Sequence, residues 1–558
     1  CSDESLINPV EIAIEKFILH PSVLMIKEQI DVEHYFSLSE ITEEDIKKEI
    51  EFLDSNKKGS FANIPANVLK ENANICSIHL KNIWNEEIIH KKNFPSNLKF
   101  ADVTPIFKKD DALMVKNYRP VSVLPCVSKV FERILQKQLM AYMEKFLSPS
   151  LNGYRKSYNT QTALLKLVEI WKNSLDQKGF AGGVLMDLSK AFDTINHELL
   201  IAKLYSYGIH KESLAIVLDY FTDRQQRVKI NTTFSSWSSQ KVGVPQGSVL
   251  GPILFNFYIN DLFYFVQETN ICSFADDTTP FAVSNDIEDV IIKLEHDSLI
   301  ILEWFESNYE KLNADICHLL FSGHKFENIW AKIGNQKICE ESNVKLLVVN
   351  IDRQLKFDSH INDLCSKASK KLSAMTRLAK YLSFKKKKIL FNSFFQSQFK
   401  YCPLVWMFCG RKANNRINRL HERALRVIYD NYNLNFSELL EKDKSFTIHH
   451  QNIQMLCIEM YKIVNNGSNE GITELLNRSV DAYRGRSERD FIIPRVQTEQ
   501  YGKNSFRYLG PKIWNSLPIE IRRKSFSDFT SYIKRWKPID CPCTLCKTYI
   551  QGVGYINT

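Results

Sequence analysis

Three aspartates stand at the ends of strand-like runs, where carboxylates can gather metal ions. Asp187 closes the apolar run 182–186, and Asp276 with Asp277 separates two β-type runs within residues 271–283. A partly buried carboxylate is costly unless it is paired or bound to a metal. If these strands are neighbours in one sheet, the carboxylates converge, and Mg²⁺ prefers such oxygen ligands. Two ions about 4 Å apart could activate an attacking hydroxyl and stabilise a leaving phosphate oxygen.

The surroundings of these aspartates carry more information than the aspartates alone, because an acidic pair is also ordinary turn chemistry. Three boxes occur in order: MDLSKAFD at 186–193, a Pro-Gln-Gly loop at 243–252, and FADD at 274–277. Together they resemble the boxes of reverse transcriptases. Further segments resemble the non-LTR branch, the LINE-type and jockey-like retrotransposons, and these are residues 117–124, 152–156 and 191–197. The resemblance covers about residues 100–430.

The resemblance implies a metal site and a reaction. Asp187, Asp276 and Asp277 would hold two Mg²⁺ ions, with Mn²⁺ as an alternative. The reaction would be RNA-directed DNA synthesis, the transfer of a nucleotidyl group to a primer 3′-OH with RNA as the template. A two-metal nuclease is a rival, although it would not need Phe192 or the Pro-Gln-Gly loop.

The resemblance also implies a nucleotide site. Lys108 or Lys109, together with Arg119, would clamp the triphosphate, since a guanidinium fork and an ammonium suit phosphate. The ring of Phe192 would crowd a ribose 2′-OH and so favour deoxynucleotides, while Gln246 and Gly247 would border the nucleotide. The competing interpretations are a solvated loop for the two lysines, a core position for the phenylalanine and a plain turn for the Pro-Gln-Gly loop.

Positive charge is concentrated in one stretch. The chain holds 73 Lys and Arg against 64 Asp and Glu, a formal charge of +9. Residues 366–426 hold 16 Lys and Arg and one Glu, so this stretch carries +15 and the rest of the chain −6. This distribution favours a nucleic-acid interface over a solvated helix face or a membrane surface. The residues expected to contact phosphates are Lys385, Lys386, Lys387, Lys388, Arg416, Arg419, Arg423 and Arg426.

Cysteines cluster only near the end of the sequence. Cys541, Cys543 and Cys546 have spacing that suits Zn²⁺, but a fourth ligand is not evident nearby, so free thiols are the alternative. The other cysteines are scattered singly, which favours a reducing compartment. Because the sequence begins with Cys1, we interpret it as a fragment.

The elements that must position these residues follow from hydrophobic periodicity. We expect a hairpin with a charged tip over 101–124, helices over 128–146 and 160–175, and a short strand over 182–187. Basic amphipathic helices follow after about residue 350, including one with an apolar stripe over 361–382.

The fold class expected from the resemblance is α+β, a right-hand polymerase with fingers, an antiparallel-sheet palm, a helical thumb and a helical C-terminal extension. The expected domains are an N-terminal helical region or linker (1–100), fingers and palm (101–345), thumb (346–430) and the extension with the cysteines (431–558). The expected partners are an RNA template, a DNA primer or target DNA, and deoxynucleoside triphosphates, with no membrane. We expect an intracellular protein of nucleus and cytoplasm, and the oligomeric state stays open.

Two residues depart from the family pattern. Ile316 occupies a place where a Lys is usual, a candidate general acid for the leaving pyrophosphate. Val348 stands where a Gly is usual and would strain a tight backbone contact. Both fit an alternative in which a decayed element copy acts only as a nucleic-acid-binding protein.

Overall fold

The chain folds into a mixed α+β structure of two compact units. The computed structural model describes residues 8–56, 64–108, 111–186, 188, 191–310, 312, 317–324, 326, 328–478 and 490–536. Unit 1 comprises residues 1–154, 187–267 and 299–315, and unit 2 comprises 155–186, 268–298 and 316–558. Each unit is therefore assembled from three separate stretches of chain.

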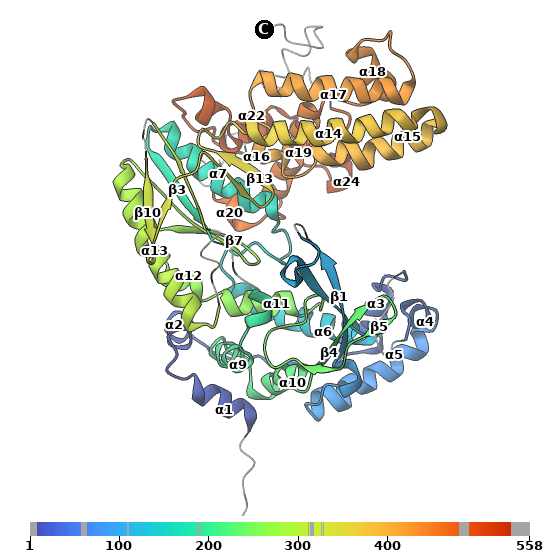
Figure 1. Ribbon diagram of the computed structural model, residues 1–558, viewed down its shortest axis with the longest axis vertical. Coiled ribbons are helices and arrows are strands. Elements are labelled where there is room, and N and C mark those ends of the chain that lie inside the picture. Colours follow the sequence, from blue (N-terminus) through green and yellow to red (C-terminus); the bar gives the residue numbers. More distant parts are fainter. Residues whose placement is uncertain are drawn as a thin grey trace, which may run out of the picture. The chain divides into compact units, whose positions relative to one another are not determined.

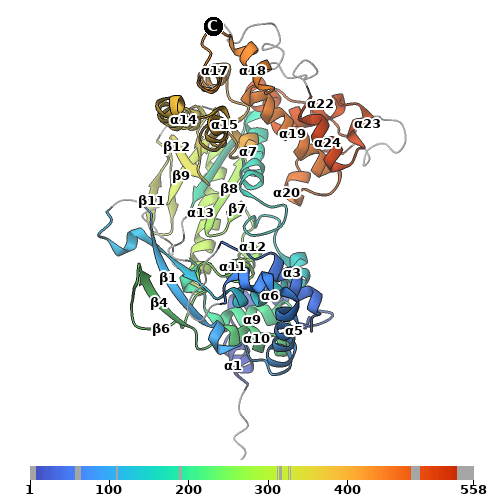
Figure 2. The same cartoon turned by 90° about the vertical axis from the view of Figure 1, so that its right-hand side faces the viewer.

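Unit 1 combines a curved sheet with a group of helices (Figure 2). Its strands are β1 (Phe100–Phe107), β2 (Tyr118–Val123), β4 (Gln225–Ile230), β5 (Thr233–Phe234) and β6 (Ser238–Ser239). Its helices are α1 (Pro9–Lys16), α2 (Pro21–Gln29), α3 (Glu43–Glu51), α4 (Ala66–Glu71), α5 (Ala73–Asn82), α6 (Cys126–Met143), α8 (Ala191–Thr194), α9 (His197–Ser206), α10 (Lys211–Phe221), α11 (Gly251–Ile259) and α12 (Leu262–Phe265). β1 pairs antiparallel with β2 and parallel with β4. The predicted hairpin and the predicted helix after it are confirmed.

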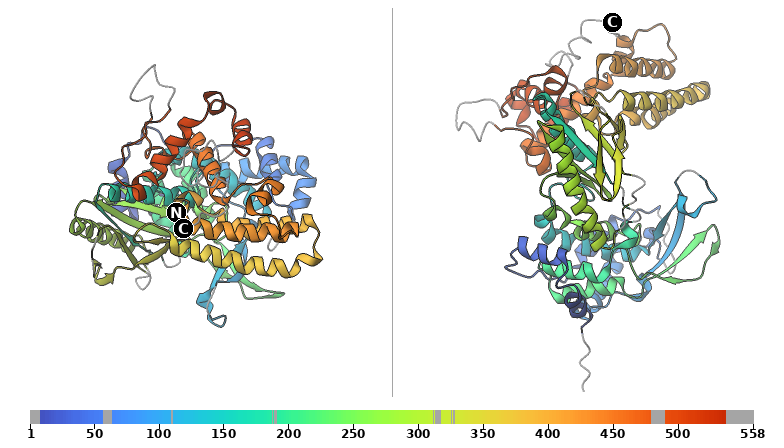
Figure 3. Two further views of the ribbon diagram at one scale, coloured as in Figure 1. Left: turned by 90° about the horizontal axis from the view of Figure 1, so that it is seen from above. Right: turned by 60° about the vertical axis from the view of Figure 1, so that its left-hand side comes forward.

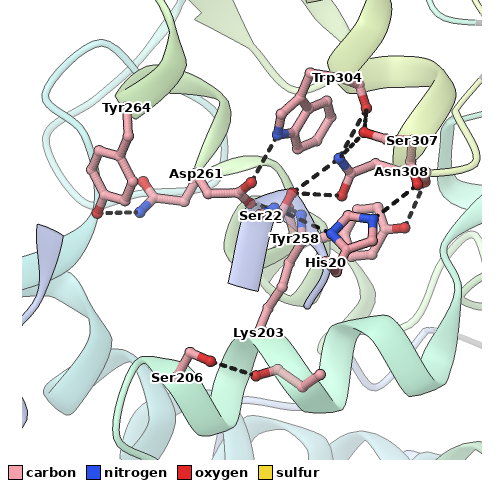
Figure 4. Close-up of polar contacts among 12 residues, drawn as sticks. His20, Ser22, Lys203, Ser206, Tyr258, Asp261, Tyr264, Trp304, Ser307 and Asn308 are labelled. Atoms are coloured by element: carbon pink, nitrogen blue, oxygen red, sulfur yellow. Dashed lines mark hydrogen bonds and ion pairs between the residues drawn. The ribbon is translucent and has the colours of Figure 1, made fainter. Parts of the chain in front are cut away.

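A fully buried ion pair joins the helices of unit 1. Lys203 on α9 donates to Asp261 Oδ1 at 2.6 Å, and neither side chain is exposed. The second oxygen of Asp261 accepts from Trp304 Nε1 at 2.7 Å (Figure 4). Nearby, Asn308 Nδ2 donates to Ser22 Oγ of α2 at 3.1 Å. Buried charges are tolerated only when their hydrogen bonds are satisfied, so this network fixes how the N-terminal helices pack within unit 1.

Unit 2 is built on a four-stranded antiparallel sheet in the order β7-β8-β3-β9. These strands are β3 (Phe180–Leu185), β7 (Asn270–Phe274), β8 (Asp277–Ser284) and β9 (His318–Ser322). Short hairpins add β10 (Trp330–Ile333) with β11 (Gln336–Cys339) and β12 (Asn343–Leu346) with β13 (Val349–Asp352). The predicted strand near residue 182 and the predicted acidic hairpin are both present.

Two long helices cover opposite faces of this sheet, α7 (Thr160–Asp176) and α13 (Ile287–Ser307) (Figure 1). Successive strand residues point to opposite faces. A Cβ added at Gly183 would lie 3.1 Å from the ring of Trp171 on α7, and one added at Gly182 would lie 2.9 Å from Val290 on α13. The paired glycines of β3 therefore let both helices approach the strand that leads to Asp187.

The rest of unit 2 is helical. The helices are α14 (Asp358–Leu378), α15 (Phe384–Leu390), α16 (Pro403–Trp406), α17 (Arg411–Tyr429), α18 (Phe436–Asp443), α19 (Ile448–Val464), α20 (Glu470–Thr473), α22 (Phe506–Ser516), α23 (Ile519–Arg522) and α24 (Phe526–Ile533). Two of them, α14 and α17, lie side by side (Figure 3). The predicted apolar stripe of α14 is largely confirmed, since Ile361, Leu364, Ala368, Leu372 and Met375 are buried.

The last described helices are held to α7 by buried carboxylates. Glu169 accepts from the backbone N–H groups of Phe506 and Arg507, at 2.9 and 3.0 Å, and so caps the start of α22. Two turns further along α7, the buried Asp176 accepts from the backbone N–H of Thr498 at 2.8 Å. These contacts make residues 490–536 an integral part of unit 2.

Candidate active site and nucleic-acid interface

The acidic hairpin of unit 2 ends in a tight turn that displays two carboxylates. Phe274 pairs with Asp277, which leaves Ala275 and Asp276 as a two-residue loop. Ala275 adopts a left-handed conformation with φ +57°, as short hairpin loops require. Both aspartates are half-buried. This oxygen donor set suits a hard cation such as Mg²⁺.

Asp187 lies outside the described residues, but Met186, which precedes it in the chain, pairs with the strand that begins at Asp277. Met186 forms an antiparallel bridge with Thr278, with backbone hydrogen bonds of 3.0 and 3.3 Å. Asp187 follows Met186 directly in the sequence, just as Asp277 directly precedes Thr278. Among the described residues, no group of three metal-ligating side chains is found. The grouping of all three aspartates stays a prediction.

The predicted triphosphate residues lie on the β1–β2 hairpin of unit 1. Lys108 and Arg119 are exposed there, and the backbone N–H of Lys108 donates to Asn117 O at 2.9 Å across the hairpin. Neither side chain forms an ion pair within the part of the chain that the structure describes. Lys109 lies outside the described residues. Both visible cations are therefore available to an anionic ligand.

Phe192 and the Pro-Gln-Gly loop lie together in unit 1. The backbone N–H of Val244 donates to Phe192 O at 2.7 Å, and that of Ser122 on β2 donates to Gln246 O at 2.7 Å. Gly247 has φ +116°, and a Cβ there would lie 2.6 Å from Ser122 O. A side chain at this position would push the loop away from β2, so the glycine is required by both conformation and space.

The ring of Phe192 is half-buried, with its centroid 5.0 Å from that of Phe255. Phe192 therefore packs against Phe255 but is not fully buried. Its role under a sugar stays a prediction.

The predicted phosphate contacts on α17 differ in their exposure. Arg416, Arg419 and Arg423 are exposed, whereas Arg426 donates to Glu422 at 2.7 Å and is half-buried. The other exposed positions between Arg411 and Tyr429 are Arg411 and Lys412 themselves. The exposed face of α17 is thus entirely basic.

The lysine run on α15 divides in the same way. Lys385 and Lys386 are exposed, and Lys387 is half-buried. Lys388 donates at 2.5 Å to Asp443, whose side chain is buried. An ion pair with a buried carboxylate gives Lys388 a structural task in addition to any contact with phosphate.

Several other predictions fall on residues outside the described part of the chain. These are Ile316 and the candidate zinc ligands Cys541, Cys543 and Cys546. Val348 is described: it lies with Leu347 in the two-residue turn between β12 and β13, and both have positive φ, +71° and +45°.

Two residues near these sites were missed by the sequence reasoning. Tyr401 donates from its hydroxyl to Leu347 O at 2.8 Å, and burial, which is the main cause, raises its pKa, with a smaller contribution from the charge of Asp277. Asp193 accepts from the Gln246 side-chain amide at 2.8 Å. Asp193 stands inside a box that the sequence singles out, but no spacing rule connects residues 193 and 246.

Comparison with known proteins identifies the family. A family model described as reverse transcriptase (RNA-dependent DNA polymerase) matches residues 106–351. The probable RNA-directed DNA polymerase from transposon BS of Drosophila melanogaster is 24% identical over 409 residues, 69% of this chain and 44% of that protein. The RNA-directed DNA polymerase from mobile element jockey of the same species is 26% identical over 349 residues, 60% of this chain and 38% of that protein. Residues 106–351 therefore match the reverse transcriptase family, and the chain is similar to the jockey-like non-LTR retrotransposon enzymes.

The chain spans less than half the length of those curated relatives. No helix within its described residues is both long and apolar enough to cross a membrane.

Proposed function

We propose that the chain is an RNA-directed DNA polymerase that copies element RNA from a DNA primer. The observation that carries the proposal is the turn at Asp276 and Asp277, whose strand β8 pairs with β3 and, through Thr278, with Met186, the residue before Asp187. Family membership and the named relatives support the same reaction. The substrates are deoxynucleoside triphosphates, and the partners are an RNA template and a DNA primer or target.

We also propose the finer architecture of a right hand. The β1–β2 hairpin would act as fingers, the β7-β8-β3-β9 sheet as palm, and the helices from α14 to α17 as thumb. The antiparallel palm sheet with acidic residues at its turn supports this assignment, as does the all-basic exposed face of α17. The boundaries at residues 100, 345 and 430 belong to the same proposal, as does a location in nucleus and cytoplasm, where target DNA and element RNA occur.

The residues would divide the reaction among them. Asp187, Asp276 and Asp277 would hold divalent metal ions, which, when bound, activate the primer 3′-OH and stabilise the departing pyrophosphate. Lys108 and Arg119 would bind and orient the triphosphate through charge-assisted hydrogen bonds. Phe192 would exclude a ribose 2′-OH. The exposed arginines of α17 would hold the nucleic-acid backbone without reading its sequence.

Primer extension on an RNA template tests the proposal. The wild-type protein should extend a DNA primer with deoxynucleotides, and Asp276→Asn or Asp277→Asn should lower the rate about 100-fold or more, because a lost metal ligand costs several kcal/mol at the transition state. Asp286→Asn is the matched control, since this exposed residue follows the far end of β8.

Two results would contradict the proposal. Unchanged extension by the Asp276 and Asp277 variants would remove the metal assignment. Template binding by the wild-type protein without any extension would favour the decayed, binding-only alternative.

A further inference from the structure

The Pro-Gln-Gly loop of unit 1 is clamped by the segment that follows Phe192. Besides the contact with Phe192 described above, the backbone N–H of Gly243 donates to Ile195 O at 2.9 Å. The carbonyl of Gly243 lies 2.7 Å from His197 Nε2. Burial lowers the pKa of His197, so its ring is neutral and donates from Nε2. The backbone of the loop is therefore fixed before any nucleotide arrives.

The side chain of Gln246 is oriented by one contact. Its amide nitrogen donates to Asp193 Oδ1 at 2.8 Å. Because an ionised carboxylate only accepts hydrogen bonds, Asp193 selects the amide rotamer that turns NH₂ toward it. Packing does not impose that choice, since both residues line a cavity of about 410 Å³. The hydrogen bond is what distinguishes the two amide orientations.

Asp193 has no other described task. It is half-buried and forms no ion pair within the described part of the chain. Two basic residues line the cavity: Arg227 is already paired with the buried Asp102 at 2.7 Å, and Lys241 forms no ion pair within the described residues. Partly burying a carboxylate costs free energy, and among the described residues the one hydrogen bond to the Asp193 carboxylate comes from the amide of Gln246.

We propose that Asp193 is a positioning residue that orients the Gln246 amide, so that its Oε1 and second N–H meet the incoming nucleotide in a fixed arrangement. The inference rests on the proposed function, because it assumes that Gln246 borders that nucleotide. Asp193 itself does not touch the substrate. Within the described residues, neither Gln246 Oε1 nor its second N–H has a hydrogen-bond partner, so both are free for this use.

Replacing Asp193 by Asn removes its control over the orientation of the Gln246 amide while keeping nearly the same side-chain volume at position 193. Asn has nearly the same volume but can donate as well as accept, so it allows both amide rotamers of Gln246. The Gln246 amide would then have the orientation that suits the nucleotide only part of the time. Its hydrogen bond to residue 193 would also lose the carboxylate charge that strengthens it. We expect about a tenfold increase in the KM for dTTP, with kcat changed by less than about threefold.

A double-mutant cycle tests whether Asp193 acts through Gln246. The variants are Asp193→Asn, Gln246→Ala and the pair together, with Asp223→Asn as the matched control, an exposed carboxylate in the same unit. Insertion of dTTP opposite a template adenine gives KM and kcat. Equilibrium binding of dTTP to the protein with template-primer in Ca²⁺ gives an affinity that needs no turnover. Melting temperatures check that each variant folds.

We expect Asp193→Asn to weaken dTTP binding when Gln246 is present and to have no further effect on dTTP binding once Gln246 is replaced by Ala. Equal effects in both backgrounds, or a wild-type affinity in the Asp193→Asn variant, would overturn the inference. If Asp193→Asn fails to fold, Asp193→Glu takes its place in the same cycle. Failure of the wild-type protein to extend primers would count against the proposed function instead, and the binding cycle would still decide the role of Asp193.

Discussion

Val348 is the residue whose backbone and side chain conflict most plainly. Among the described residues with positive φ, it alone carries a β-branched side chain. Such a conformation costs on the order of 1–3 kcal/mol and persists only where the surroundings enforce it. Here the hydroxyl of Tyr401 holds the neighbouring carbonyl of Leu347. The resemblance led us to expect Gly at this position, and the positive φ supplies the physical reason.

Replacing Val348 by Gly should therefore stabilise the protein. Val348 is 57% exposed, so little apolar burial is lost, and relief of strain should exceed the extra entropy cost of glycine. We expect the free energy of unfolding to rise by about 1 kcal/mol, measured by chemical denaturation. Val242→Gly is the control, because Val242 is 53% exposed and does not have positive φ. That variant should lose stability, and a loss at both positions would show that Val348 is not strained.

At the scale of elements, helix α7 is the support on which unit 2 is assembled. One face packs on the sheet through Trp171, while Glu169 holds the start of α22 and Asp176 holds the segment before it. The carboxylate of Asp176 accepts two backbone N–H groups and the hydroxyl of Thr498. Without this acceptor, partly buried backbone donors would lose their partner, which costs free energy.

Asp176→Ala should loosen the C-terminal helices. We expect a loss of about 3 kcal/mol in local stability, seen as faster hydrogen–deuterium exchange over residues 497–516. Asp363→Ala on α14 is the control, because Asp363 is exposed and accepts only from Asn350 in the described structure. Unaltered exchange in the Asp176 variant would mean that apolar packing alone holds this segment.

Elements were predictable from sequence where local pattern decides them. The apolar periodicity placed a helix over 160–175, and α7 spans Thr160–Asp176. The β1–β2 and β7–β8 hairpins were equally visible, because strand alternation and turn residues are local signals. The partners of charged residues were not visible. Lys388 pairs with Asp443, 55 residues away, and Asp176 with Thr498, 322 residues away. No periodicity encodes such contacts, which arise only from packing.

At the scale of the whole molecule, the distribution of charge is the feature that connects sequence to function. The stretch 366–426 carries +15 against −6 elsewhere, and in the structure it supplies an exposed helical face with only basic residues. Sequence alone could not separate the arginines that face solvent from Arg426, which is tied to Glu422. Affinity for a polyanion depends on the arginines that face solvent.

The salt dependence of template binding should report these arginines. Each phosphate contact contributes about one unit to the slope of log affinity against log salt concentration, so Arg416→Gln with Arg423→Gln should reduce the slope by about two. Fluorescence anisotropy of a labelled template-primer across a salt series measures it. Arg426→Gln, from the same helix, should change the slope little. Equal changes for the two sets would mean that the exposed face is not the binding face.

The interleaved path of the chain sets the order in which the molecule can be completed during synthesis. Unit 1 takes its last stretch from residues 299–315, whereas unit 2 needs residues 490–536 to satisfy Glu169 and Asp176 on a helix made more than 300 residues earlier. Because the chain is synthesised from its N-terminus, unit 1 can fold before the residues that donate hydrogen bonds to Glu169 and Asp176 of α7 have been synthesised. Translation that stops before residue 490 would release a protein with a complete first unit and a second unit in which Glu169 and Asp176 lack their donors from residues 497–507.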